Sequence, residues 1–331
     1  MKKLRIGILF LIIMVTMQNL LKITSIAAPK TKIITELENL HNGDAKFYRN
    51  QIVTSIGGKL TFCNLRGKLV KCYDEIHANW IDAIGTDGVV VYGNFDKEIG
   101  IARFDKENQL LSNKVIMKTK NLQIDPTITK VKNKYYITVT EVEGKVNNAE
   151  EDKKNGIYTI HLYQSSDLVK WNYVDDVIQH ANNLEDVDVK YQDNRFLVFY
   201  EKEEVDKGES SLCFRMSKDA KGSKWCPEKT IMKADCDHEP AVIEAQKDGF
   251  RIYYSSDKAN PGESYMGGNI YYMELDEQFR VEKKDVKIQT ATQKGILLYD
   301  VRKNKKGQRY FLYAKDYMTD CDLMVEKDRK K

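Results

Sequence analysis

The sequence lacks the local signatures of several common enzyme classes. It has no His-Glu-x-x-His, Gly-x-Ser-x-Gly, phosphate-binding loop or dinucleotide-binding glycine pattern, which argues against zinc-peptidase, serine-hydrolase and nucleotide-dependent chemistry. None of its six cysteines stands in a Cys-x-x-Cys spacing, so a structural zinc site is not expected. With five prolines in 331 residues and no low-complexity tract, the chain does not read as a linker-rich scaffold.

Long hydrophobic runs are also scarce, and the main one lies at the amino end. A basic start is followed by the apolar run Ile6–Val15 and by small residues at Ser25 and Ala27. This order predicts a signal peptide over residues 1–27. The run has about half of the ~20 residues that cross a bilayer, although an uncleaved anchor is the alternative. We therefore expect a secreted or cell-surface protein with no membrane span after cleavage.

Excess charge of one sign is absent from the mature chain. The formal charge of +4 comes from 53 basic and 49 acidic residues, and four of the basic residues lie in the predicted signal peptide. A neutral chain gives no reason to expect a nucleic-acid partner. We expect a monomer with a solvated charged tail at residues 327–331. Six cysteines in an exported chain permit disulfides, but the sequence does not choose a pairing, and free thiols are the alternative if the environment is reducing.

The chain is rich in short aromatic and β-branched runs bounded by Gly, Asn, Asp and Lys, and it lacks long helical periodicity. Examples are Lys134–Val139, Arg195–Tyr200 and Phe250–Tyr254. Such runs indicate strands, so we expect an all-β fold.

An acid precedes each of these aromatic runs at a nearly constant spacing. The acids Asp125, Asp186, Glu239 and Asp300 stand ten, ten, eleven and ten residues before an aromatic residue, and they are 61, 53 and 61 residues apart. A weaker copy begins at Trp80–Ala83. A repeat of this length with about four short strands is typical of a propeller blade.

Blade packing around one axis would bring the leading acids together in a central funnel. The repeat length over the mature chain favours a five-bladed β-propeller at residues 46–326, after a lead-in at 28–45, with six blades as the alternative. The segment Gln51–Tyr73 also reads as strands, and we expect it to close the ring by pairing with the last blade.

Three segments resemble a known family. Asp125-Pro126 with Tyr135-Tyr136, the element Ser165–Trp171, and Glu239-Pro240 with the later Tyr253–Ser256 look like the five-bladed glycoside hydrolases of family 43 and their invertase-like relatives. The resemblance implies cleavage of arabinan- or xylan-like carbohydrate by three acids. These are a base or nucleophile, a residue that tunes the acid, and a glutamic general acid.

Carried over to this chain, the resemblance offers Asp82, Asp186 and Glu239 for these roles, or Asp125 as the base. Glu185 and Asp188 compete with Asp186, because Leu184–Asp188 matches no family motif cleanly, and Asp82 lacks a following proline. An axial Ca²⁺ occurs among such relatives, but no ligand set is visible, so no cofactor is predicted.

Four further residues are candidates for substrate contacts: Trp80, which could stack on a sugar, Asp188, His238 beside Glu239, and Asp300. Each has a structural alternative, since Trp80 could pack in the core and Asp300 could be a structural copy of the repeated acid. Trp171 and Trp225 are expected to pack. The leading hypothesis is a secreted glycoside hydrolase that uses paired carboxyl groups. A non-catalytic propeller that binds glycan or protein, or a transferase on the same scaffold, remains open.

Overall fold

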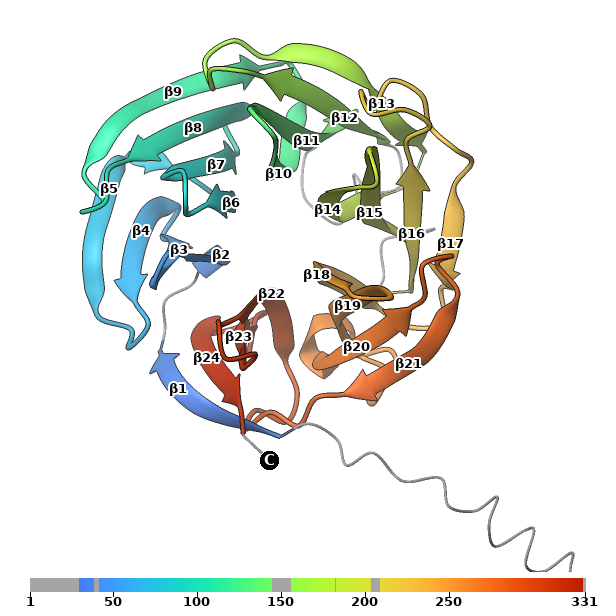
Figure 1. The fold of residues 1–331 in the computed structure, drawn as a ribbon. Helices are drawn as coiled ribbons and strands as arrows, with labels where there is room; N and C mark the ends of the chain where they lie inside the picture. Colours follow the sequence, from blue (N-terminus) through green and yellow to red (C-terminus); the bar gives the residue numbers. More distant parts are fainter. Residues whose placement is uncertain (1–29, 39–41, 145–155, 182, 204–208, 330–331) are drawn as a thin grey trace, which may run out of the picture.

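In the computed structural model, six four-stranded antiparallel sheets stand around one axis (Figure 1). The structure describes residues 30–38, 42–144, 156–181, 183–203 and 209–329. The predicted signal peptide lies outside these residues. No helix in the described ranges is long and apolar enough to cross a membrane. The all-β propeller is confirmed, with six blades rather than the favoured five.

Blades 1 to 5 each run from the axis outward in chain order. Blade 1 is β2 (Asn42–Tyr48), β3 (Gln51–Ile56), β4 (Lys59–Asn64) and β5 (Leu69–His77); blade 2 is β6 (Trp80–Ile84), β7 (Val89–Asn94), β8 (Glu98–Phe104) and β9 (Leu110–Lys118); blade 3 is β10 (Leu122–Val131), β11 (Lys134–Glu143), β12 (Ile157–Ser165) and β13 (Asn172–His180). Blade 4 is β14 (Leu184–Gln192), β15 (Arg195–Glu203), β16 (Ser210–Met216) and β17 (Lys229–Met232); blade 5 is β18 (His238–Gln246), β19 (Gly249–Ser256), β20 (Asn269–Leu275) and β21 (Val281–Lys287).

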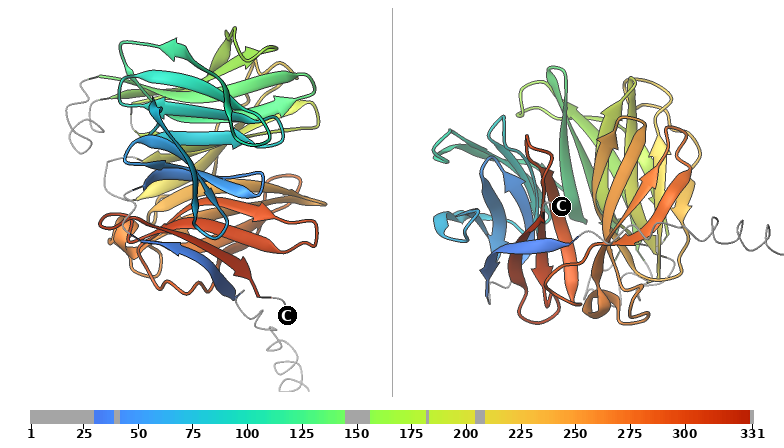
Figure 2. Two further views of the ribbon diagram at one scale, coloured as in Figure 1. Left: turned by 90° about the vertical axis from the view of Figure 1, so that its left-hand side faces the viewer. Right: turned by 60° about the horizontal axis from the view of Figure 1, so that its bottom comes forward.

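Blade 6 joins the two ends of the described chain. It consists of β22 (Ile296–Lys303), β23 (Arg309–Lys315), β24 (Asp322–Asp328) and, outermost, β1 (Thr31–Leu37). Figure 2 shows β1 beside β24 from two other sides. The ring is therefore closed by β1, and the expectation that Gln51–Tyr73 closes it is wrong, because β3, β4 and most of β5 belong to blade 1.

Unequal blade lengths explain the miscount. The inner strands of blades 1, 2 and 3 begin 38 and 42 residues apart, whereas later ones begin 54 to 62 residues apart. Dividing the chain by the longer period therefore loses one blade. The propeller also begins earlier than expected, since β1 and the start of β2 lie in the presumed lead-in, and Lys327 and Asp328 of the presumed tail belong to β24.

Tight turns and buried aromatic strands account for the blade shape. Gly57 and Gly58 join β3 to β4 with φ of 56° and 73°, the pair of positive φ values that a two-residue hairpin of matching twist requires. The blades pack face to face through strand residues such as Tyr136 of blade 3 and Phe196 of blade 4, whose ring centroids are 4.6 Å apart. Trp225 lies in this core and Trp171 packs against another, as expected. All six cysteines are free thiols.

Candidate functional site

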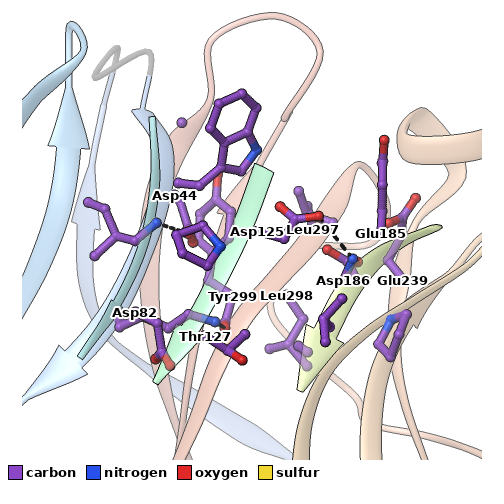
Figure 3. Close-up of a pocket in the computed structure, with 18 of the residues that line it drawn as sticks. Asp44, Asp82, Asp125, Thr127, Glu185, Asp186, Glu239, Leu297, Leu298 and Tyr299 are labelled. Atoms are coloured by element: carbon purple, nitrogen blue, oxygen red, sulfur yellow. Dashed lines mark hydrogen bonds between the residues drawn. The ribbon is translucent and has the colours of Figure 1, made fainter. Parts of the chain in front are cut away.

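The six inner strands surround an axial cavity of about 140 Å³ (Figure 3). Every inner strand supplies part of its wall, near the strand's amino end. The short 3₁₀ helix η1 (Ser264–Gly267) adds Tyr265, and the connection from β23 to β24 adds Tyr317. Six carboxyl side chains line the cavity, together with one ammonium group: Asp44, Asp82, Asp125, Glu185, Asp186, Glu239 and Lys46. The expected convergence of acids on the axis is therefore observed.

Local backbone irregularities aim several of these acids. In β10 the register to β11 skips between Ile124 and Thr127, and in β14 it skips between Glu185 and Asp188. Asp125 and Asp186 lie in these bulges with φ of 48° and 50°. Aspartate tolerates the left-handed region better than a β-branched residue would. A bulge changes the direction in which side chains leave a strand, and here it turns both acids toward the axis.

A side chain accepts a hydrogen bond from the next blade at each of the six blade junctions. The acceptor oxygen lies 2.6 to 3.2 Å from a backbone nitrogen of the following inner strand. In junction order, the pairs are Asp44 with Ile81, Asp82 with Ile128, Asp125 with Asp186, Asp188 with Ile243, Ser255 with Leu298, and Asp300 with Phe47. These bonds, which we call junction bonds, link each blade to the inner strand of the next blade, where no backbone ladder among the described strands joins the two sheets.

Four junction acids use both carboxylate oxygens in this way. The second oxygen accepts from Ala45 for Asp44, from Ala83 for Asp82 and from Val301 for Asp300, while Asp188 accepts from the ammonium of Lys190. Asp188 and Asp300 also do not line the cavity. The structure thus gives Asp82, Asp188 and Asp300 a structural role at the junctions.

Lys46 supplies positive charge among these acids. Its Nζ donates to the carbonyl oxygen of Tyr299 over 3.0 Å. Burial by itself would lower the pKa of Lys46, but the charges of Asp44, Asp82, Asp300 and Asp188 outweigh burial and raise it. The carboxylates of Asp44, Asp82 and Asp300 accept backbone N–H groups on both oxygens, and the ammonium of Lys46 adds positive charge near them. They do not form an open oxygen cage of the kind that Ca²⁺ prefers, so an axial Ca²⁺ does not fit this set.

Asp125, Asp186 and Glu239 form a different group on the other side of the cavity. They come from the inner strands of three consecutive blades, and Asp125 uses only one oxygen in its junction bond. The carboxyl groups of Asp186 and Glu239 are hydrogen-bonded to each other. In Figure 3 both lie beside Glu185, away from Asp82. A hydrogen bond between two carboxyl groups needs a proton on one of them. Burial raises the pKa of the junction acids Asp44, Asp82 and Asp300 as well, to about 6 for Asp82.

Burial and mutual repulsion raise the pKa of all three acids in this group. Burial, followed by the charges of Glu185 and Asp186, raises the pKa of Asp125. Burial raises the pKa of Asp186 to about 7. Burial together with the charges of Glu201, Asp237 and Asp186 raises the pKa of Glu239 well above its usual value. Carboxyl groups that keep a proton near neutrality are able to act as general acids.

The remaining predicted residues divide between the cavity wall and the core. Trp80 lines the cavity and packs edge-on against the exposed Phe95, with ring centroids 5.1 Å apart. His238 is fully buried and is not part of the wall; its Nδ1 bonds to the carbonyl oxygen of Ser210 and its Nε2 to the thiol of Cys236. Asp235 lies close to this pair. Burial raises the pKa of the Cys236 thiol to about 11, so the cluster does not offer a ready thiolate for zinc.

Sequence reasoning missed several residues of the site. Asp44 was assigned to the lead-in, and nothing in the local sequence distinguishes Lys46, Tyr265 or Tyr317 from ordinary strand and loop residues. Glu201 of β15 lies behind the wall, with a carboxylate oxygen within 4.8 Å of those of Asp186 and Glu239. Only the folded arrangement of blades brings these side chains to the acids.

Comparisons with known proteins identify a family and several similar structures. Residues 111–325 match Glycosyl hydrolases family 43. Among solved structures, the chain is similar to an alpha-L-arabinofuranosidase from Lactobacillus brevis (12% identity, 75% of this chain and 89% of the other, TM-score 0.53). It is also similar to a thermostable family-43 glycoside hydrolase (14%, 75% and 95%, 0.52) and to a protein described as a glycoside hydrolase (13%, 92% and 93%, 0.54).

At these identities the structural likeness shows a shared propeller fold. Comparison with curated proteins finds no match. The family match covers more than half of the chain, including Asp125, Asp186 and Glu239. The chain belongs to glycosyl hydrolase family 43.

Proposed function

We propose that this protein hydrolyses glycosidic bonds with Glu239 as the general acid and Asp125 as the base that activates water. Asp186, between them, tunes the proton affinity of Glu239. The observation that carries this proposal is the convergence of these three carboxyl groups, from consecutive blades, on one axial cavity. Glycoside hydrolysis requires a proton donor for the leaving oxygen and a carboxylate that assists attack at the anomeric carbon.

The contacts of the two end acids support this division of roles. Burial and the charges of Glu185 and Asp186 raise the pKa of Asp125, and the backbone N–H of Asp186 that it accepts opposes this rise in part. Glu239 instead faces the carboxyl groups of Glu201, Asp237 and Asp186, which favour its protonated form. Asp82 is the weaker choice of base, because both its oxygens already accept backbone N–H groups.

The size of the cavity supports action on one sugar unit at a time. Its volume of about 140 Å³ lies below the ~300 Å³ at which pockets for drug-sized ligands begin. We take this axial space to hold a single terminal sugar, with the rest of the glycan outside it. We propose that the enzyme removes terminal arabinofuranosyl or xylosyl units from arabinan- or xylan-like chains.

Aromatic side chains around the cavity fit a sugar ligand. Burial raises the pKa of Tyr265 well above its usual value, so its hydroxyl stays protonated and able to donate to a sugar hydroxyl. Trp80 offers an aromatic face of the kind on which sugars stack. We further propose that residues 1–27 direct export, which sequencing the amino end of the mature protein would test.

Product analysis tests the function directly. Purified protein is incubated with arabinan, xylan and their oligosaccharides, and we expect free monosaccharide as the earliest product with little fall in polymer viscosity. Glu239→Gln should abolish release, whereas Glu282→Gln, an exposed glutamate of the same blade, should not. Binding of these glycans without any new reducing ends would contradict the proposal and support a non-catalytic propeller.

A further inference from the structure

Glu201 is a buried carboxyl group behind the cavity wall. It lies on β15, the second strand of blade 4, directly opposite Glu185 of the inner strand. Its side chain is 1% exposed and does not line the cavity. Even so, its carboxylate lies within 4.8 Å of the carboxylates of both Asp186 and Glu239. Two like-charged residues directly opposite on neighbouring strands are normally destabilising, so this placement needs an explanation.

The described residues give Glu201 no cationic partner. None of their ion pairs involves Glu201, Asp186, Asp237 or Glu239. Lys202, next in sequence, pairs with Glu228 instead. The Oε1 atom of Glu201 is buried and has no hydrogen-bond partner among described protein atoms. An isolated buried carboxylate is costly, and burial together with the charges of Glu203 and Asp186 raises the pKa of Glu201 well above its usual value.

We propose that Glu201 is a positioning residue for the reaction: from behind the wall, its carboxyl group competes with Glu239 for a proton, and its proximity favours the state in which Glu239, the side chain that faces the cavity, holds that proton. This inference rests on the proposed function. During hydrolysis the proton of Glu239 passes to the leaving oxygen, and the proton of the attacking water passes to Asp125. Solvent exchange then restores both groups, and Glu201 never contacts the sugar.

Other groups also face this pair and contribute to its titration. They are Glu185 and Asp186 on β14, Glu203 on β15, Asp237 on β18, Tyr265 on η1, Tyr317 before β24 and, near Asp186, Lys46 on β2. Unlike Glu185 and Asp186, Glu201 does not line the cavity. Its removal therefore changes the proton affinity of Glu239 without removing a sugar contact.

The test is the pH dependence of kcat and kcat/KM for wild type, Glu201→Gln, Glu201→Asp and the exposed control Glu209→Gln. Loss of the neighbouring carboxyl group makes Glu239 release its proton more easily. We expect the alkaline limb of Glu201→Gln to move at least one pH unit toward acid, with KM within twofold of wild type, and Glu201→Asp to restore part of the shift. An unchanged limb in an active, folded Glu201→Gln variant would overturn the inference while leaving the proposed function intact.

A second measurement does not depend on activity. The melting temperature is followed from pH 5 to pH 9 for the same variants, in EDTA and in 1 mM CaCl₂. Competition of these carboxyl groups for a proton predicts that wild type loses stability as pH rises and that Glu201→Gln loses less. Equal slopes, or a rise of several degrees in wild type caused by Ca²⁺ alone, would overturn the inference, since a bound cation would then neutralise the cluster. Absence of hydrolysis by wild type would contradict the proposed function alone.

Discussion

The backbone N–H of Asp186 donates to Oδ2 of Asp125 over 3.2 Å, so the bulged acids of blades 3 and 4 fix each other. The same bond is the junction bond between these blades. At the other carboxylate junctions the donor is an apolar or aromatic residue. Among the six junction bonds, only this one joins two acids of the proposed reaction. The positions of these acids therefore depend on how blades 3 and 4 pack.

The junction bonds predict that some axial acids matter for stability and not for chemistry. Asp300→Ala removes the acceptor for the N–H groups of Phe47 and Val301 and leaves buried donors unpaired. A loss of about 2–3 kcal/mol in the free energy of unfolding is expected, measured by urea denaturation. The kcat of the folded variant should stay within about twofold of wild type. Asp320→Ala, at an exposed site, is the control; a large fall in kcat without loss of stability would place Asp300 in the site instead.

We expect the positive charge of Lys46 to stabilise the folded protein, because several buried acids lie around it. Lys46→Met removes the positive charge near Asp44, Asp82, Asp188 and Asp300, and leaving buried charges uncompensated commonly costs about 3–5 kcal/mol. Because Lys46 also borders the cavity, we expect a smaller loss of about 2–4 kcal/mol, largest above pH 7 and smaller near pH 4, where carboxyl groups take up protons. Urea denaturation at both pH values measures this, with exposed Lys114→Met as the control.

An equal loss at pH 4 and pH 8 would show that Lys46 acts through packing of its hydrocarbon chain. The charge explanation would then be wrong, although the contact with the Tyr299 carbonyl would stand.

The raised pKa of Asp186 predicts that the acidic cluster lowers the free energy of unfolding as pH rises. Its pKa is raised from 3.8 to about 7 by burial, so between these values the folded state binds more protons than the unfolded state. Stability therefore falls as pH rises through this window. Asp186→Asn removes the effect and should raise the free energy of unfolding at pH 8 by about 2 kcal/mol, with little change at pH 4.

Thermal unfolding across pH 4–8 checks this prediction. At roughly 2–4 °C per kcal/mol for a domain of this size class, the variant should melt several degrees higher at pH 8. Asp248→Asn, which changes an exposed turn residue, should follow wild type at every pH. A variant that is less stable than wild type at pH 8 would show that Asp186 is ionised and favourably solvated in the folded protein.

The sequence was sufficient for the all-β propeller and for the inner-strand positions of Asp125, Asp186 and Glu239, because these depend on local pattern, but not for the number of blades or the closure of the ring. Alternating aromatic strands with acids ten or eleven residues ahead of them identify the inner and second strands of blades 3 to 6. Blades 1 and 2 are shorter and carry weaker copies, so their period does not stand out. For the same reason, Asp44 of blade 1 was not recognised as an acid of the central cavity.

The rest of the site depends on contacts that no local pattern reports. Whether an acid such as Asp82 binds a neighbouring backbone or faces the cavity is decided by the angle between blades. Glu201 lies on a second strand, outside the repeated position of the acids, and approaches Glu239 only because blades 4 and 5 pack side by side. Nothing in the local sequence distinguishes Lys46 from the other lysines, and only the folded ring places it beside the axial acids.

The division of roles between Glu239 and Asp125 predicts different responses to the leaving group. A general acid is needed when the departing oxygen is strongly basic and much less when the leaving group is a stabilised phenolate. Glu239→Gln should therefore lose about 10²–10⁴-fold in kcat/KM on arabino- or xylo-oligosaccharides and far less on 4-nitrophenyl glycosides. Asp125→Asn should lose activity on both, because attack by water is impaired whatever the leaving group. Steady-state kinetics on matched pairs of substrates decide the matter, with Glu282→Gln as the control; equal losses for both substrates in Glu239→Gln would remove Glu239 from the role of proton donor.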